Sequence, residues 1–407
     1  MRAFALVGLA NCWTGSSSAP APPVASTTAT AQLAAPSLDL RFGVRGRAVF
    51  DIGPGEHELH AVVALADGSA LVAGHAFFDK RDACVARFTR DGVLDPHFGS
   101  GGVARVGTSE AFVRAVAVDR KARILVAGYF YAPGEAENLL LARLLPDGTL
   151  DASFGTRGVV TADYGKSDDR PSAVLPLADG NIAVVGIHGT RAGSEYEMYT
   201  ARFDDRGRQL HVTFVDLLPG REFVSRAKLD RDGSIVVAGY AVGDAGGFVA
   251  RLAPDGTLDR TFGVKLVPEL AGGSVWALAI DARGRILLGG QTATDRAVAV
   301  RFTADGARDR TWGDGGIAGG AEHAGDQLYE LLPQADGGAI AVGFRGLASN
   351  AKTLVARFAE NGAARWRVGD TAGDFTFAAA ADLRGGVIAV GMTSPRDEIR
   401  GLVVRYR

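Results

Sequence analysis

Two kinds of side chain that could bind a ligand recur at corresponding places along this chain. Acidic residues precede short apolar runs, and aromatic residues follow the glycine of a recurring VAG-like word. Aromatic rings and carboxylates on one surface suit a sugar, a cationic ligand or a protein partner. The same residues could instead fill gaps between strands and cap turns. The candidate binding residues are Phe77, Phe78, Tyr129, Tyr131, Tyr196, Tyr240, Asp168, Asp169, Glu222, Asp326 and Asp374.

Motifs of known enzymes are incomplete in this sequence. GKS at 165–167 would need a glycine at position 160 to form a phosphate loop, and that residue is Val160. HELH at 57–60 is not HExxH, and the other histidines are scattered, so no zinc site is predicted. GSGGVA at 99–104 occupies a recurring turn with no helix after it. The sequence therefore predicts no catalytic residue, no cofactor and no metal.

One arginine recurs in words such as VARF, LARL and VVRY. An aspartate follows it by eight residues in four copies, as Asp95, Asp151, Asp259 and Asp309. Across a hairpin this spacing favours an ion pair between facing strands, and recurrence in every copy indicates a structural role. The alternative is a ring of arginines that binds an anion. The seven arginines are Arg87, Arg143, Arg202, Arg251, Arg301, Arg357 and Arg405.

The elements that position these residues are internal repeats. Seven VAG-like words end at glycines from Gly74 to Gly391, roughly 53 residues apart. Each copy contains runs of Val, Ile, Leu and Phe separated by Gly, Asp and Asn, which predict four strands, and no longer stretch has a helical period. Two connections per copy have constant length and the other two vary, so rigid turns should share one face and variable loops the other.

These features predict an all-β fold, a seven-bladed β-propeller of four-stranded antiparallel blades. Alanine-rich first strands suit the crowded innermost position. The runner-up is an open β-solenoid. The last copy ends at Arg407 without its fourth strand, whereas SLDLRFG at 37–43 stands alone at the front. We therefore expect the N-terminal strand to complete the last blade in a 3+1 closure, with Asp39 facing Arg405.

The combined words, DG–VAG–variable–ARxxxDGxLDxxFG, resemble the bacterial delta-60 repeat over about residues 37–407. This resemblance implies a propeller-type repeat common in secreted and surface proteins, and it transfers no shared activity. Copies three and six depart from it, with RQLHVTF and AARWRVG in place of LDxxFG. Those two blades are expected to have a distorted outer edge.

The N-terminus has the pattern of an export signal. Residues 1–12 combine Arg2, a short apolar run and the lipobox-like word LANC, in which Cys12 would receive lipid. Because the apolar run is short and Asn11 is unusual in a lipobox, the alternatives are an ordinary secretion signal and no export signal at all. Residues 13–36, rich in Ser, Ala and Pro, predict a flexible tether before the propeller at 37–407.

The expected function follows from this organisation. A net charge of −2 gives no reason to expect nucleic acid as a partner. We expect a monomer that is exported as an outer-membrane or cell-surface lipoprotein or is secreted, and that contacts the membrane only through its lipid. It would serve as a non-catalytic scaffold for a protein or glycan ligand. The alternatives are a propeller enzyme, such as a glycosidase or lyase with acids at the channel mouth, and a purely structural envelope component.

Overall fold

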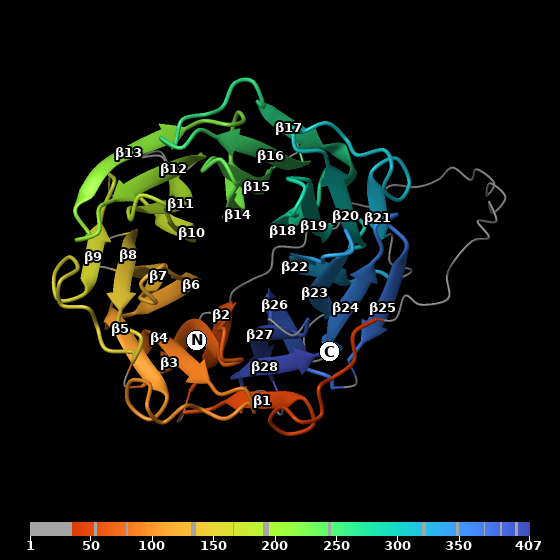
Figure 1. The fold of residues 1–407 in the computed structure, drawn as a ribbon. Helices are drawn as coiled ribbons and strands as arrows, with labels where there is room; N and C mark the ends of the chain where they lie inside the picture. Colours follow the sequence, from red (N-terminus) through yellow and green to blue (C-terminus); the bar gives the residue numbers. More distant parts are fainter. Residues whose placement is uncertain are drawn as a thin grey trace. The chain divides into compact units, whose positions relative to one another are not determined.

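The computed structural model describes residues 35–52, 55–78, 80–131, 136–165, 167–189, 195–242, 246–319, 323–346, 350–369, 371–382, 385–394 and 398–407. The expected signal peptide, Cys12 and nearly all of the expected tether lie outside the described residues. Within them, twenty-eight strands form seven four-stranded antiparallel sheets arranged as a ring (Figure 1). The chain is thus a seven-bladed β-propeller, as the repeats predict.

The first three blades follow one another along the chain. Blade 1 contains β2 (His57–Ala64), β3 (Ala70–Phe77), β4 (Arg81–Phe88) and β5 (Val103–Ser109). Blade 2 contains β6 (Ala111–Val118), β7 (Ile124–Tyr131), β8 (Glu137–Leu144) and β9 (Val159–Ala162). Blade 3 contains β10 (Asp169–Pro176), β11 (Ile182–Gly189), β12 (Tyr196–Phe203) and β13 (Gln209–Val215).

The remaining blades continue this order. Blade 4 contains β14 (Glu222–Leu229), β15 (Ile235–Ala241), β16 (Gly246–Leu252) and β17 (Val264–Val267), followed by the 3₁₀ turn η1 (Pro268–Leu270). Blade 5 contains β18 (Ser274–Ile280), β19 (Ile286–Gln291), β20 (Ala297–Phe302) and β21 (Ile317–Gly319). Blade 6 contains β22 (Asp326–Pro333), β23 (Ala339–Arg345), β24 (Lys352–Phe358) and β25 (Ala364–Val368). Blade 7 contains β26 (Asp374–Ala381), β27 (Val387–Thr393), β28 (Arg400–Tyr406) and β1 (Arg47–Phe50).

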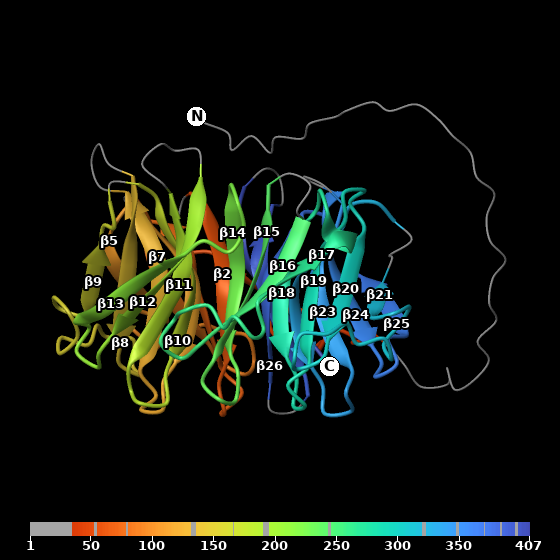
Figure 2. The same ribbon diagram turned by 90° about the horizontal axis from the view of Figure 1, so that it is seen from above.

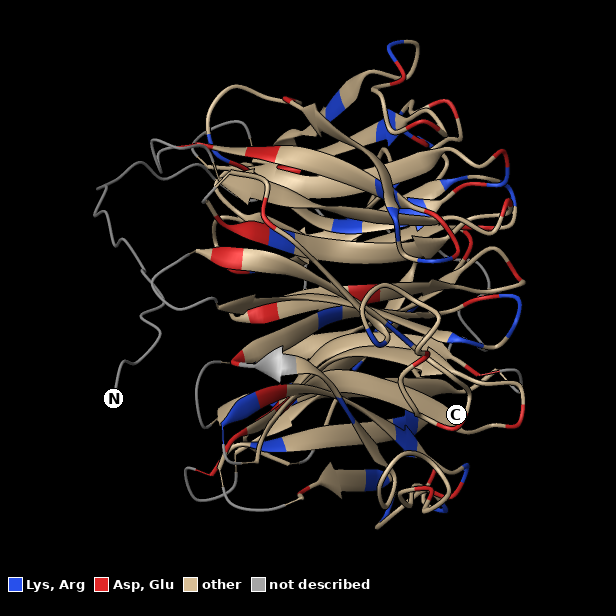
Figure 3. Cartoon of the chain, turned by 90° about the vertical axis from the view of Figure 1, so that its left-hand side faces the viewer, with Lys and Arg blue, Asp and Glu red and all other residues tan. Residues whose placement is uncertain are grey.

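The constant turns are built by their own Asp-Gly residues. In the first turn of blade 1, Gly68 has a φ of +85° and donates its N–H to the Leu65 carbonyl at 3.0 Å. Asp67 accepts a 2.9 Å bond from the Ser69 N–H. Because an Asx side chain and a glycine in the left-handed region both favour such a turn, each DG word fixes a hairpin. These turns lie on one face of the ring, where Figure 3 shows charged residues gathered, and the strands run between the two faces (Figure 2).

The hydrophobic core lies between neighbouring blades. The first strand of each blade contacts the first strands of the blades beside it, around the axis in Figure 1. The largest fully buried side chain is Trp312, which packs with Phe358 of the next blade at a ring distance of 5.7 Å. Each blade therefore buries its apolar faces against its neighbours.

The ring closes through the N-terminal strand. β1 pairs antiparallel with β28, with Arg47 opposite Val404 and Phe50 opposite Gly401. The LDLRFG word contacts β28 through an isolated bridge from Leu38 to Tyr406 and a 2.9 Å bond from the Asp39 N–H to the Arg405 carbonyl, and then turns. The added strand is therefore the tail that follows the word. The predicted 3+1 closure is therefore confirmed. The closing strand β1 begins a few residues after the LDLRFG word.

The outer edges of blades 3 and 6 differ from the expectation. Their fourth strands, β13 and β25, are seven and five residues long. β25 pairs with β24 without interruption, whereas the pairing of β13 with β12 shifts register between Arg202 and Phe203. In the blades with LDxxFG or its relative, the fourth strand has seven residues in blade 1, four in blades 2 and 4, and three in blade 5. The expected distortion is therefore absent from blade 6, whereas blade 3 has one irregularity, beside Phe203. In the described part of the chain, no helix is long and apolar enough to cross a membrane.

Candidate binding site in the central channel

A β-bulge interrupts the innermost strand of every blade. In each blade the pairing of the first and second strands shifts by one residue beside the glycine of the VAG word. The extra residue left by such a shift changes direction relative to its neighbours. The seven bulge residues are His60, Arg114, Ser172, Ser225, Trp276, Tyr329 and Phe377.

The bulge explains why a glycine recurs in the VAG words. A Cβ atom on Gly74 would lie 1.9 Å from the carbonyl oxygen of Glu58, and on Gly128 it would lie 1.8 Å from that of Phe112. The same clash recurs at the other five glycines, and none of the seven has a positive φ. Close approach of the innermost strand, rather than backbone conformation, therefore requires glycine here.

All seven bulge residues line one cavity of about 440 Å³ in the central channel. Its other lining residues are Arg170, Pro171, Ile187, Phe223, Val224, Arg226 and Tyr240. Because the blades are arranged in sequence around the ring, the bulge residues divide into two arcs. Blades 5, 6, 7 and 1 supply aromatic rings, and blades 2, 3 and 4 supply a guanidinium and two hydroxyls.

The aromatic arc is a continuous series of ring contacts. Trp276 and Tyr329 stack with centroids 5.5 Å apart and an interplanar angle of 5°. Tyr329 contacts Phe377 at 5.6 Å, and Phe377 stacks on His60 at 5.8 Å. Burial raises the pKa of Tyr329 to about 12, so its hydroxyl is a neutral donor at physiological pH. This wall can hold the flat apolar face of a ligand.

Arg226 reaches from blade 4 to the backbone of two residues of this wall. It follows the bulge of blade 4, at a position held by alanine in five other blades, for example Ala61 and Ala277. Its guanidinium donates to the carbonyls of Tyr329 and Phe377, each at 3.2 Å, and lies 3.8 Å from Glu330. Arg226 thus joins three blades and forms part of the cavity wall.

Arg114 is the polar feature most available to a ligand. Its side chain is exposed in the channel and lies over the ring of Tyr129 at 5.8 Å. Among the described residues no hydrogen bond or ion pair is formed by its guanidinium. Arg170, in contrast, is engaged by Glu137 and Asp168. Arg114 can therefore bind an anionic or hydroxyl group with little rearrangement.

The acids singled out from sequence lie mainly in buried hydrogen bonds at the start of the innermost strands. Asp169 is 2.7 Å from the His188 ring nitrogen, and Asp326 forms a two-bond ion pair with Arg345. Asp374 accepts a 2.6 Å bond from Arg47 of β1. Asp168 pairs with Arg170 at 2.8 Å. These carboxylates tie strands and blades together.

Glu222 is fully buried and serves as a cap for a loop. Its carboxylate accepts the backbone N–H groups of Met198, Leu217 and Leu218 at 2.8–3.4 Å. Burial raises the pKa of Glu222 to about 7, against the opposing effect of these bonds. It does not line the cavity.

The aromatic candidates lie at and around the cavity. Tyr240 lines it and contacts Phe223 and Trp276, and Tyr196 packs on Phe223 at 5.2 Å. Tyr129 stacks on Phe112, and Tyr131 donates its hydroxyl to Glu137. Phe77 is exposed on the loop side, and Phe78 lies under Arg105. Only Tyr240 of the predicted binding residues reaches the cavity itself.

The recurring arginines lie on the turn face, away from this cavity. Arg143, Arg251 and Arg301 each place Nε 2.8 Å from the aspartate eight residues later, and Arg87 lies 3.4 Å from Asp95. Blades 3 and 6 lack that aspartate, and there Arg202 and Arg357 pair with Asp179 and Asp336 of the first turn. The guanidinium also reaches the next blade, as when Arg143 donates to the Asp205 carbonyl at 2.5 Å.

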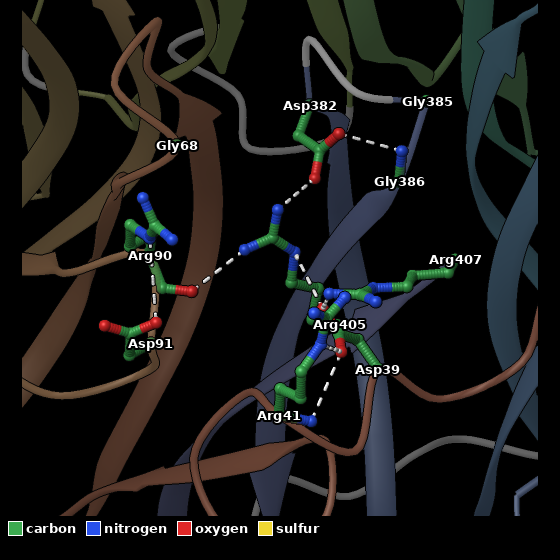
Figure 4. A pocket seen from close by; sticks show the side chains of 10 residues that line it. All are labelled: Asp39, Arg41, Gly68, Arg90, Asp91, Asp382, Gly385, Gly386, Arg405 and Arg407. Atoms are coloured by element: carbon green, nitrogen blue, oxygen red, sulfur yellow. Dashed lines mark hydrogen bonds and ion pairs between the residues drawn. The ribbon is translucent and has the colours of Figure 1, made fainter.

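The same arrangement forms a second cavity, of about 370 Å³, where the ring closes (Figure 4). Arg405 donates to the Arg90 carbonyl of blade 1 at 2.9 Å, pairs with Asp382 and lies 3.8 Å from Asp39. Arg407 also reaches Asp39, at 2.5 Å. The charges that line this cavity are thus engaged with one another, which favours a structural role.

Three segments of the chain match a known family. Residues 65–98, 123–154 and 231–262 match the "Domain of unknown function (DUF5122) beta-propeller", and each ends at the phenylalanine of an LDxxFG word. These three segments are thus similar to repeats of a β-propeller family. No curated protein sequence matches it.

Solved structures show the same architecture. The chain is similar to a streptogramin B lyase structure, with a TM-score of 0.56 and 12% identity over 88% of this chain and 97% of that one. It is also similar to Sqt1 from Chaetomium thermophilum, with a TM-score of 0.50 and 10% identity over 88% and 98% of the two chains. At these identities the likeness shows the fold alone.

Sequence reasoning missed the bulge residues. A positional signal could have identified them. In every copy the bulge residue varies in type and is followed directly by a small or charged residue, as Ala61 follows His60 and Ala277 follows Trp276. It was hidden because the bulge breaks the two-residue alternation by which inward-facing positions are recognised.

Proposed function

We propose that the protein is an exported, non-catalytic binding module of the bacterial cell surface, built from delta-60 repeats. Its ligand is a glycan or a similar ring compound with one apolar face and polar or acidic edges, and it enters the central cavity. Residues 37–407 would form the recognition domain and residues 13–36 its tether.

The ring of bulges carries this proposal. Seven copies repeat the same backbone device, including its glycine, while the side chain that each bulge directs into the cavity varies from Trp to Ser to Arg. A constant scaffold that presents varied chemistry at one cavity is typical of a binding site.

The division of the cavity wall into an aromatic arc and a polar arc supports a glycan-like ligand. Trp276, Tyr329 and Phe377 offer ring faces to an apolar sugar face, and Ser172 and Ser225 lie in the opposite arc with Arg114. Among the described lining residues there is no Asp or Glu, whereas a glycosidase of the usual kind needs a pair of carboxylates. The arrangement therefore favours binding over hydrolysis.

A glycan array probed with the labelled full-length protein tests the proposal. Trp276→Ala and Arg114→Ala should each weaken binding to the recognised glycans at least about tenfold, because they remove a stacking face and a charge-assisted donor. Phe77→Ala is the matched control, since Phe77 is exposed on the loop side outside the cavity. Binding that is lost in Phe77→Ala and kept in Trp276→Ala would contradict a channel site.

Export rests on the sequence of residues 1–36 and needs its own test. If Cys12 is lipidated, the protein should fractionate with membranes and incorporate labelled palmitate, and Cys12→Ser should abolish both. A Cys84→Ser control should change neither, because the Cys84 thiol is buried in blade 1. Recovery of wild-type protein in the cytoplasm with its N-terminus intact would refute export.

A further inference from the structure

Blade 1 brings two histidines and a glutamate together at the channel wall. Atoms of Glu58, His60 and His75 that can bind a metal all lie within 4.8 Å of one another. Glu58 stands directly opposite His75 in the pairing of β2 with β3, and His60 is the bulge residue of β2. The cluster therefore results from the same backbone device that shapes the cavity.

We propose that Glu58, His60 and His75 bind one divalent transition-metal ion of the zinc class. Two imidazoles and one carboxylate are a ligand set suited to Zn²⁺ and its first-row neighbours. Three protein ligands leave at least one coordination position open, and His60 also lines the central cavity. The ion would be reached from the channel and would present its open position there.

Comparison of the seven blades shows that this composition is special to blade 1. The position of His75 follows the VAG glycine and holds Tyr129, Tyr240 or Phe344 in other blades. The three corresponding positions of blade 7 hold Phe375, Phe377 and Met392. Only blade 1 has metal-ligating side chains at all three, although the scaffold is the same.

The chemical state of the cluster suits a cation. Burial lowers the pKa of His75 to about 3 and also lowers that of His60, so both imidazoles are neutral at pH 7 and can offer a lone pair. Burial is the largest influence on the pKa of Glu58 and raises it, but the hydrogen bond to His60 and the charges of His60, His75 and Arg114 together lower it to about 2. His60 Nε2 lies 3.3 Å from the Glu58 carboxylate.

One atom in the cluster also lacks a partner. The Nδ1 atom of His75 is buried without a hydrogen bond, and the residue is only 4% exposed. Ligands of a tetrahedral zinc lie roughly 3.3 Å apart, given bonds of about 2.0–2.1 Å, so closing on an ion requires movements of about an ångström. Small rotations of these side chains suffice.

The positive charge of Arg114 disfavours metal binding by Glu58, His60 and His75. Its charge acts on all three residues and disfavours a second cation nearby. The proposal therefore predicts that Arg114→Gln binds metal more tightly than the wild type, which a purely structural histidine cluster would not do.

The test is titration of metal-free full-length protein with Zn²⁺ by calorimetry. The wild type should bind one equivalent, and His60→Gln and His75→Gln should each weaken binding at least about 100-fold. His97→Gln is the control, because His97 is exposed and far along the chain in a turn. Absence of stoichiometric binding to the wild type, or equal binding by His75→Gln, would overturn the proposal. Unchanged or weaker binding by Arg114→Gln would also count against it.

A second measurement needs no variant and covers the case in which the histidine variants do not fold. X-ray absorption of the zinc-loaded wild type should show two imidazoles and an oxygen donor around the metal. A coordination shell without imidazole would overturn the proposal. The metal site does not depend on the glycan proposal, because a failed array leaves both zinc measurements unaffected.

Discussion

The glycines of the VAG words are the residues on which the channel geometry most directly depends. At Gly239, a Cβ atom would lie 1.9 Å from the carbonyl oxygen of Phe223 and 2.8 Å from its carbon. Neither atom can move without displacing the innermost strand of blade 4 and the bulge at Ser225. A single methyl group therefore affects both the stability of the blade and the shape of the cavity.

We predict that Gly239→Ala lowers the free energy of unfolding by about 3 kcal/mol or more, because it forces backbone apart. Gly180→Ala is the comparison. Gly180 has a φ of +85° but nothing lies within 4 Å of its added Cβ, so only backbone strain of about 1 kcal/mol is expected. Urea unfolding of both variants measures the difference, and equal losses would contradict the steric explanation.

Glu222 should make stability depend on pH. Its pKa is raised from 4.5 to about 7 in the folded protein, so between these values the unfolded chain releases a proton that the folded one retains. Stability from this group is therefore fully present below about pH 4.5 and decreases as the pH rises to about 7, by at most about 3 kcal/mol.

Glu222→Gln removes this titration. Its unfolding free energy should change less between about pH 4.5 and 7 than that of the wild type, measured by urea unfolding at several pH values. Curves that run parallel for the two proteins would show that Glu222 ionises alike in the folded and unfolded states.

Sequence alone located the blades but not the site, and the reason is visible at single residues. Tyr240 was found because it follows a recurrent glycine, whereas Trp276 and Tyr329 lie in strands whose alternation is broken by a bulge. Asp374 is recognisable as a loop acid, but its partner Arg47 comes from β1, near the other end of the chain. Pairing between distant strands cannot be inferred from spacing along the chain.

At the scale of elements, the repeat words position turns more precisely than strands. The eight-residue spacing from arginine to aspartate correctly indicated facing strands, since Arg143 Nε lies 2.8 Å from Asp151. In blade 2 the LDxxFG word forms a turn, and the fourth strand starts only at Val159. Its extended-looking letters give no local signal of this turn.

The arginine also joins one blade to the next, which leads to a prediction. Arg143 is 1% exposed, and Arg143→Ala should cost about 3 kcal/mol because Oδ2 of Asp151 and the Asp205 carbonyl lose the bonds that Arg143 donates. Arg208→Ala, at an exposed arginine in the second turn of blade 3, should change stability by less than about 0.5 kcal/mol. Chemical denaturation of both variants is the measurement, and a loss below 1 kcal/mol for Arg143→Ala would contradict the joining role.

The closing strand can be tested as a separate piece. Deletion of residues 37–50 should lower the melting temperature sharply, because it exposes the edge of β28 and removes Phe50 from the core. A peptide of residues 35–52 should bind the deleted protein and restore its melting temperature. A deleted protein that melts like the full chain would refute closure by this strand.

At the scale of the whole molecule, each blade contacts chiefly its two neighbours, as in other repeat proteins. A ring differs from an open array because no blade has a free side. We therefore predict that the full chain unfolds in one calorimetric transition, with equal calorimetric and van't Hoff enthalpies. The chain without 37–50 should unfold over a broader range with unequal enthalpies, and a single sharp transition in both would show that closure does not create the cooperativity.

The pairing of β1 with β28 also has a consequence for the time course of synthesis. Arg47–Phe50 leaves the ribosome among the first folded residues, but its partner, Arg400–Tyr406, is made about 350 residues later. At roughly 5–20 residues per second, this strand waits tens of seconds without its native neighbour. Final assembly must therefore be post-translational, and during that interval the nascent chain carries an unpaired strand at its leading end.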